Sequence, residues 1–334
     1  MSIKNRVALM TKSSQNKESI KLVRLAPYFG TFMFGGILIL FSFTSPYFLT
    51  FGNLSNILLQ SSIVGVASLG MVYVIIVGGD DVIQGGIDLS CAAFIGLTAT
   101  VTAFFLSRGH SLVISVTLGI LISVFGGICN GIGVVYGIRP LLMTLGMGAV
   151  VTSADLIFSN NRQILIENKF FEWLRDATYF GLGIAVYIYL FTFLILFSLF
   201  HGTSIGIRAY AVGGNSTAAL ISGIKTKKYI FNSYVISAVC ASISGILILA
   251  RLSSSTPRAG DIILLDVILA SFMSVIFSRR FMPNLAGVFV SAIFIATLSN
   301  AFTLLNFPSY WTSGIKGVII LVIVATRSKR SWVK

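Results

Sequence analysis

Charged side chains are scarce in this sequence of 334 residues: they make up 10% of the chain, against 56% hydrophobic residues. A soluble domain carries roughly 25% charged residues. This composition therefore argues against a water-soluble helical core and for a membrane protein. Acidic residues are the rarest charge class, with 10 Asp and Glu against 24 Lys and Arg, so the formal net charge is +14.

Cysteine and histidine are also rare, with three and two residues respectively. Cys91, Cys129 and Cys240 each fall within an apolar run and have no metal-ligand spacing, so we expect neither disulfides nor a zinc site. The segment Gly223-Ile224-Lys225-Thr226 lacks the contiguous Gly-Lys-Ser/Thr of a phosphate-binding loop. The sequence also has no stretch long enough for a soluble catalytic domain. We expect no catalytic site, cofactor or metal, and any ATPase would be on another chain.

Apolar runs occupy most of the chain, and a bilayer-spanning helix needs about 20 mostly apolar residues. The runs predict an all-α, polytopic membrane protein of about ten transmembrane helices with a short cytoplasmic coupling helix. The predicted spans are 27–43, 56–77, 86–106, 112–135, 141–158, 179–200, 230–250, 262–278, 285–305 and 313–326.

Lys and Arg are distributed unequally over the connections between these spans. With a cytoplasmic N-terminus, most of them fall on the cytoplasmic side, as the positive-inside rule requires. The prediction is a cytoplasmic tail at 1–26, a transmembrane domain at 27–326 with a cytoplasmic loop at about 201–229, and a cytoplasmic tail at 327–334. The topology accounts for the basic charge, so nucleic acid is not an expected partner, whereas membrane lipid is.

The loop at 201–229 is a polar island between two apolar runs. Asn215 is a good N-cap, because its side-chain oxygen can accept an orphan backbone N–H of the first helical turn. Gly223 suits the position after the C-cap, where the backbone is left-handed, and Ile224 can fold back on the helix end. The pattern predicts a helix of about seven residues, too short to be stable alone in water. We interpret it as a docking surface for a soluble partner.

Small residues recur every fourth position in the fourth predicted span, and such a stripe lets another helix backbone approach closely. The stripe comprises Ser115, Gly119, Ser123, Gly127 and Gly131. Packing is the favoured interpretation, and lining a solute path is the alternative.

Polar residues inside predicted spans are costly and usually face a cavity or a partner. Asn130 beside the stripe and Asn300 in the ninth span could line a path or bond a neighbouring helix, and both interpretations stay open. Asp88 follows a glycine-rich break between the second and third spans. It is expected to cap the next helix, with a role in gating or proton coupling as the alternative.

Several short motifs follow one another in the order found in one protein family. They are Gly85-Gly86-Ile87-Asp88-Leu89-Ser90, Asn130-Gly131, Pro140 with Thr144-Leu145-Gly146-Met147, Gly213-Gly214-Asn215 with Ala218-Ala219 and Gly223-Ile224, Ser237 to Gly245, Arg251 to Leu265-Asp266, and Trp311 with Lys316-Gly317. From about residue 50 to 325 the chain resembles permease subunits of bacterial ABC importers, in the ribose and monosaccharide branch.

The resemblance implies a monosaccharide or similar small polar solute, an inner (cytoplasmic) membrane location, and several partners. Two permease subunits would form the path, a periplasmic binding protein would deliver the solute, and ATP-binding subunits would drive transport. Each permease would rest its short helix on an ATPase subunit, and the implied docking residues are Arg208, Gly213, Gly214, Asn215, Ala218, Ala219, Gly223 and Lys225. Segments 257–260 and 308–311 would contact the binding protein.

One departure from the family pattern follows Leu265-Asp266. Such permeases usually carry a glycine-rich run there, whereas this chain has bulkier residues from Ala270 to Asn284, and Asp80-Asp81 looks inserted. A divergent permease that does not transport, or that works only in a heterodimer, is therefore one alternative. An ion-coupled secondary transporter is another, although Asp88 and Asp266 lie near span ends.

Overall fold

A computed structural model describes residues 29–79, 86–278, 281–308 and 311–321. The predicted tails, the Asp80-Asp81 insertion and Arg279-Arg280 lie outside these ranges. Helices dominate the described residues, so the all-α prediction is confirmed. They are α2 (Phe29–Thr44), α3 (Phe51–Gly78), α4 (Cys91–Ser107), α5 (Leu112–Val135), α6 (Pro140–Ser159), α7 (Lys169–Asp176), α8 (Ile184–His201), α9 (Ser204–Gly214), α10 (Ser216–Ile221), α11 (Thr226–Leu252), α12 (Asp261–Met273), α13 (Leu285–Leu304) and a C-terminal helix, Trp311–Leu321.

Six helices within the described ranges are long and apolar enough to cross a membrane: α3, α5, α6, α8, α11 and α13. The other four predicted spans also contain helices, but these are shorter. For example, α4 begins at Cys91 rather than at Gly86, because residues 86–88 have no helical structure. Its 17 residues span about 26 Å at 1.5 Å per residue, against a hydrocarbon core of about 30 Å. The count of ten crossings therefore stays a prediction.

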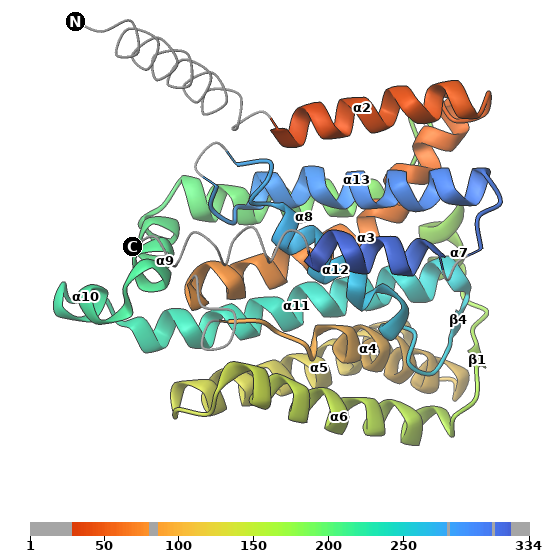
Figure 1. The fold of residues 1–334 in the computed structure, drawn as a ribbon. Helices are drawn as coiled ribbons and strands as arrows, with labels where there is room; N and C mark the ends of the chain where they lie inside the picture. Colours follow the sequence, from red (N-terminus) through yellow and green to blue (C-terminus); the bar gives the residue numbers. More distant parts are fainter. Residues whose placement is uncertain (1–28, 80–85, 279–280, 309–310, 322–334) are drawn as a thin grey trace, which may run out of the picture.

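The long helices run side by side in one bundle (Figure 1), and α3 and α11 form its centre. α11 contacts α3, α4 and α5, while α3 also contacts α8, α12 and α13. α5 and α6 lie at the edge, and over the most apolar part of α6 only 17% of the residues are buried, against 94% in α3. α5 and α6 therefore offer apolar surface to lipid or to another protein.

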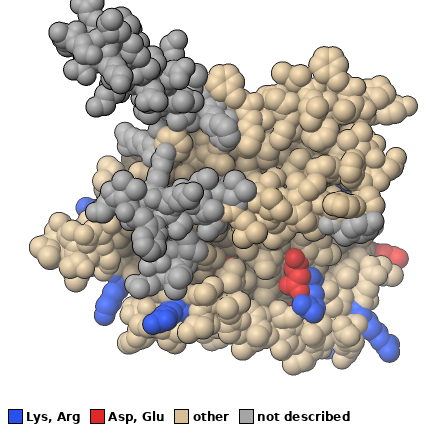
Figure 2. All heavy atoms as spheres, in the orientation of Figure 1, with Lys and Arg blue, Asp and Glu red and all other residues tan. Residues whose placement is uncertain are grey.

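Charged side chains lie mainly at the two ends of the bundle. α9 and α10 project from one end, and α7, β1 (Ile164–Leu165) and β4 (Ser254–Ser255) lie at the other. Figure 2 shows uncharged residues across the middle of the visible face, with Lys and Arg near the α9–α10 end and both signs nearer the opposite end. This distribution is typical of a bundle whose middle lies in hydrocarbon.

The predicted loop at 159–178 is partly ordered into secondary structure. β1 pairs antiparallel with β4, and the amphipathic helix α7 follows. The Gln163 side chain donates to Ser254 Oγ at 2.7 Å, and the Ile166 N–H donates to the Ser253 carbonyl at 3.0 Å. A second hairpin, β2 (Thr178–Tyr179) with β3 (Leu182–Gly183), leads into α8. These contacts join two connections far apart in the sequence into one surface.

α12 packs closely on α3 despite the missing glycine run. Ser68 Oγ donates to the Val267 carbonyl at 3.3 Å, and Ser271 Oγ donates to the Ser68 carbonyl at 3.4 Å. Ala270 and Ser271 are fully buried, so small side chains provide the close approach here. Farther on, Gly287 lies against the Ser274 carbonyl, where a side chain has no room.

Candidate functional site

The polar island folds into two short helices, α9 and α10, joined at Asn215. The Thr203 side chain accepts the Ile205 N–H at 3.1 Å and so caps α9. Asn215 Oδ1 accepts the Ala218 N–H at 2.9 Å and caps α10. Gly223 has a φ of 81°, and the Ile224 N–H donates to the Ala219 carbonyl at 3.0 Å. The predicted capped helix is therefore present, while its docking role stays a proposal.

One of the expected docking residues on α10, Ala219, does not lie on the exposed face of the helix. Ala219 is only 4% exposed and packs into the hydrophobic core, so its side chain is not on the free surface. Leu220 and Ile221 are 60% and 83% exposed. This exposed apolar pair on a short polar loop is a candidate contact surface. Sequence reasoning missed this pair because alternation around a six-residue helix is too brief to show which face is buried.

Gly213 attaches α9 to the end of α3. A side chain at Gly213 would meet the Ile76 carbonyl, and one at Gly79 would meet the Gly213 carbonyl. Gly79 also has a φ of 83°, which glycine adopts at little cost. Gly214, by contrast, has open space around it. Of the two expected docking glycines, the first thus packs α9 against α3 and the second is free.

Tyr210 joins α9 to the segment that precedes α13. Its hydroxyl donates to the Pro283 carbonyl at 2.8 Å. Burial raises the pKa of Tyr210 to about 12, so the hydroxyl keeps its proton and stays a donor at neutral pH. Gly213 and Tyr210 therefore both help to hold the island against the bundle.

Asp88 lies between α3 and α4 and is completely buried. Its Oδ1 accepts the Ser90 N–H at 3.1 Å and the Ser90 hydroxyl at 2.5 Å, and its Oδ2 accepts the Ser237 hydroxyl at 2.7 Å. Asn130 Nδ2 donates to Ser90 Oγ at 2.7 Å. The carboxylate therefore joins the break to α11 and, through Ser90, to α5.

Asp88 also contacts the start of α4, where a capping role is expected. The N-cap position of α4 is Ser90, which makes no side-chain capping bond. The Asp88 carboxylate accepts the backbone N–H of Ser90 and that of Cys91, the first residue of α4. It therefore pairs with a backbone donor of the first helical turn from two positions before the N-cap.

The small-residue stripe of α5 faces α4 and α11. Ser123 and Thr98 hydroxyls lie 2.8 Å apart. A side chain at Gly127 would meet Ala238 and the Tyr234 carbonyl, and one at Gly131 would meet Phe231. The two stripe glycines therefore bring α5 against α11, as packing requires.

Asn300 bonds a neighbouring helix. Its Nδ2 donates to Asn53 Oδ1 at 2.9 Å, linking α13 to α3, and the residue is 5% exposed.

Two further carboxylates, the largely buried Asp266 and the buried Asp155, have partners that the sequence did not reveal. Asp266 on α12 lies 2.7 Å from Lys316 Nζ on the C-terminal helix, with side chains 16% and 10% exposed. Asp155 Oδ2 accepts the Arg258 backbone N–H at 2.8 Å. A charged side chain in a membrane span needs a partner, so the sequence could indicate that each carboxylate has one. It could not indicate which residue the partner is, because that depends on the packing of helices far apart in the chain.

At the end of the bundle that carries α7, the exposed Arg175 lowers the pKa of Asp176 through a hydrogen bond.

Comparison with known proteins identifies the chain. Residues 53–324 match the family model described as branched-chain amino acid transport system / permease component. The chain belongs to this permease family. It is a membrane-spanning permease subunit of an ABC importer, an integral inner-membrane protein that carries no ATPase of its own. The family implies ATP-binding subunits and a periplasmic binding protein as partners.

Several of the similar curated proteins are named as sugar permeases. The chain is 30% identical to the ribose import permease protein RbsC of Bacillus subtilis (strain 168) over 92% of this chain and 94% of the relative. It is 29% identical to the D-allose transport system permease protein AlsC of Escherichia coli (strain K12), over 89% and 90%. For the L-arabinose ABC transporter permease protein AraH of Azospirillum brasilense the identity is 27%, over 85% and 82%. No solved structure matches the chain.

Proposed function

We propose that this permease carries a monosaccharide or a similar small polar solute. The supporting observation is similarity along nearly the whole of both chains to a ribose import permease, with allose and arabinose permeases beside it. Two permeases, identical or paralogous, form the path. A periplasmic binding protein delivers the solute to the end that carries α7, β1 and β4, where the joined connections make one surface.

The chain crosses the membrane ten times with both termini in the cytoplasm. The positive-inside count supports the cytoplasmic position of the termini. The presence of a helix within each predicted span supports the number of crossings. The four short helices are compatible with crossing if neighbouring helices cover their ends, because polar backbone at membrane depth is tolerated where it is buried in protein.

The island at 201–229 docks on the ATPase subunit. α10 offers Leu220 and Ile221 as the apolar contact, and Arg208 and Lys225 flank it. Motion of α10 reaches the membrane through Gly213, whose backbone lies against Ile76 on α3. α3 leads to the segment that holds Asp88. Closure of the ATPase subunits upon ATP binding would therefore pull directly on the centre of the bundle and alternate access to the path.

Affinity purification of the chain from its native membranes tests this function. We expect an ATP-binding subunit to co-purify with the wild type and to be lost from Ile221→Asp. Ile138→Asp is the control, since Ile138 is also apolar and exposed but lies on the connection between α5 and α6, outside the island. Retention of the ATPase by Ile221→Asp would contradict the docking assignment.

Uptake of ribose, arabinose and allose is then measured in cells that express this chain together with the partners found by purification. This measurement tests which solute is carried. ATPase recovery together with uptake of none of these sugars would favour the divergent permease without transport activity. Recovery of a second, different permease would show a heterodimer.

A further inference from the structure

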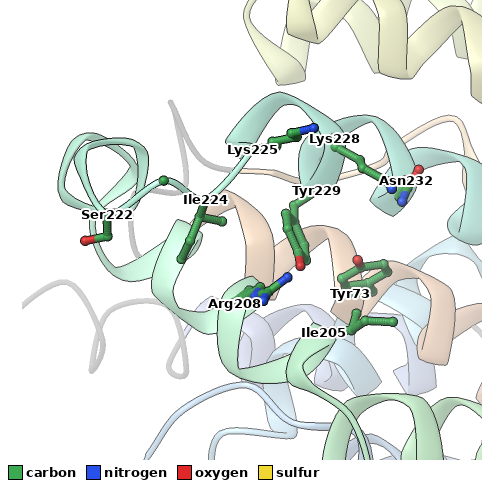
Figure 3. Close-up of a pocket in the computed structure, with 10 residues that line it drawn as sticks. Tyr73, Ile205, Arg208, Ser222, Ile224, Lys225, Lys228, Tyr229 and Asn232 are labelled. Carbon is green, nitrogen blue, oxygen red and sulfur yellow. The ribbon is translucent and has the colours of Figure 1, made fainter.

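A cavity of about 570 Å³ lies beside α10, the proposed docking helix. Helices α3, α9 and α11 and the turn after α10 enclose it (Figure 3). It is lined by Tyr73, Ile205, Arg208, Ser222, Gly223, Ile224, Lys225, Lys228, Tyr229 and Asn232. Small-molecule sites typically measure about 300–1,000 Å³, so the cavity has room for a small ligand.

The charged side chains that are described in the lining of this cavity are all basic. Arg208 enters from α9, and Lys225 and Lys228 enter from the start of α11. No described carboxylate lines the cavity or forms an ion pair with these three side chains. A concave site lined by one sign of charge concentrates ions of the opposite sign. The cations therefore provide a site for an anion.

Neutral hydrogen-bonding groups complete the lining. In Figure 3 the Tyr229 hydroxyl and the Arg208 guanidinium point toward one another, and the Asn232 amide lies on the same side as Lys228. Arg and Lys recognise phosphate oxygens, Arg through its planar pair of donors and Lys as a point charge. Hydroxyl and amide groups add donors for the remaining oxygens. This mixture suits a phosphate better than a carboxylate, which has only two oxygens to satisfy.

We propose that this cavity binds a phosphate-bearing anion. The shared chemistry is a phosphate group held by Arg208, Lys225 and Lys228, and two sources can supply it: the headgroup of an anionic phospholipid or a free phosphate compound in the cytoplasm. Binding belongs to the chain alone and does not require the docking proposed above. Because Gly223 and Ile224 line the cavity, an occupied site would stiffen the turn that ends the docking helix.

Thermal unfolding of the purified full-length chain tests the proposal with two probes. The first is inorganic phosphate, titrated at constant ionic strength against chloride into protein in neutral detergent. The second is the membrane, compared between nanodiscs of pure phosphatidylcholine and nanodiscs with phosphatidylglycerol. Lys228→Gln removes one lining cation that has no assigned docking role. Lys227→Gln is the matched control, an exposed cation on the same turn that does not line the cavity.

We expect a saturable rise in the melting temperature of wild type and Lys227→Gln with one of the two probes. For Lys228→Gln the apparent affinity should fall about tenfold, the effect of losing one charge-assisted hydrogen bond. A response to phosphate in detergent identifies a free phosphate compound, and a response to phosphatidylglycerol alone identifies a lipid headgroup. Equal responses of the two variants, or no response of wild type to either probe, would overturn the proposal. ATPase co-purification is measured separately, so failure of one proposal leaves the other intact.

Discussion

Ser237 and Ser242 are buried hydroxyls on α11 with different partners. Ser237 donates to the Asp88 carboxylate, while Ser242 donates to the Ala238 carbonyl of its own helix at 2.7 Å. We expect Ser237→Ala to lower the free energy of unfolding by about 1–3 kcal/mol, because a buried charged acceptor loses a donor. Ser242→Ala should change it by less than about 0.5 kcal/mol, since that carbonyl can keep its helical hydrogen bond. Denaturant unfolding in detergent measures both, and equal losses would contradict the role of Asp88.

The Asp266–Lys316 pair gives a second prediction at the residue scale. Lys316→Met leaves a buried carboxylate without its cation, which typically costs about 3–5 kcal/mol. The double variant Asp266→Leu with Lys316→Met removes both charges and should recover most of that loss. A double-mutant cycle of unfolding free energies measures the coupling, and additive losses would show that the two side chains act independently.

Single residues were predictable from sequence where the interaction is local. Asn215 and Gly223 cap α10 as predicted, because cap geometry involves residues only a few positions apart. The expected capping contact of Asp88 is local too, but its carboxylate also accepts a hydrogen bond from Ser237, 149 positions along the chain. Nothing in a short pattern encodes such a partner.

Helix α5 shows what a small residue contributes at the scale of an element. Gly127→Ala places a methyl group against Ala238 and the Tyr234 carbonyl, so we expect destabilisation of about 1–3 kcal/mol from overpacking. Gly146→Ala on α6 meets open space and should stabilise by up to about 1 kcal/mol, because Ala has the higher helix propensity. Thermal melts of the two variants should therefore shift in opposite directions. A shift in the same direction would show that the stripe does not hold α5 against α11.

Elements with strong apolar character were predictable, and amphipathic or short ones were not. α3 and α11 coincide with predicted spans because a long apolar run has few other structures in a membrane. α7 lies in the connection between the fifth and sixth predicted spans, since its eight residues are too few for a span and four of them are charged. For the same reason, the inward orientation of Ala219 could be read only from tertiary packing.

Orientation in the membrane is a property of the whole molecule. In a cysteine-free background, Lys169→Cys on α7 should react with a membrane-impermeant maleimide added to intact cells. Arg139→Cys on the connection between α5 and α6 should react only after the membrane is opened, because the positive-inside rule puts that connection in the cytoplasm. Both positions are exposed, so protection reports the membrane and not burial. The reverse labelling pattern would invert the proposed topology.

At this scale, composition together with the length of the apolar runs was enough to predict an all-α membrane protein. The number of crossings was less predictable, because hydropathy does not show where a helix ends within an apolar run. Residues 86–88 illustrate this, since they fall within the third predicted span but form the segment before α4. Their place depends on the hydrogen bonds of Asp88 with α11, which form only in the folded chain.

The contact between Gly79 and Gly213 constrains how this chain can evolve. A side chain at either glycine would collide with the backbone of the other segment. Neither position can therefore accept a side chain unless the opposite backbone moves away. Substitutions at the two sites should therefore be inherited in compensating pairs rather than singly. A genetic selection for restored growth after Gly213→Ala should return second-site changes at the end of α3, far from α10 in sequence. Revertants confined to the docking loop would show that the two backbones are free to separate.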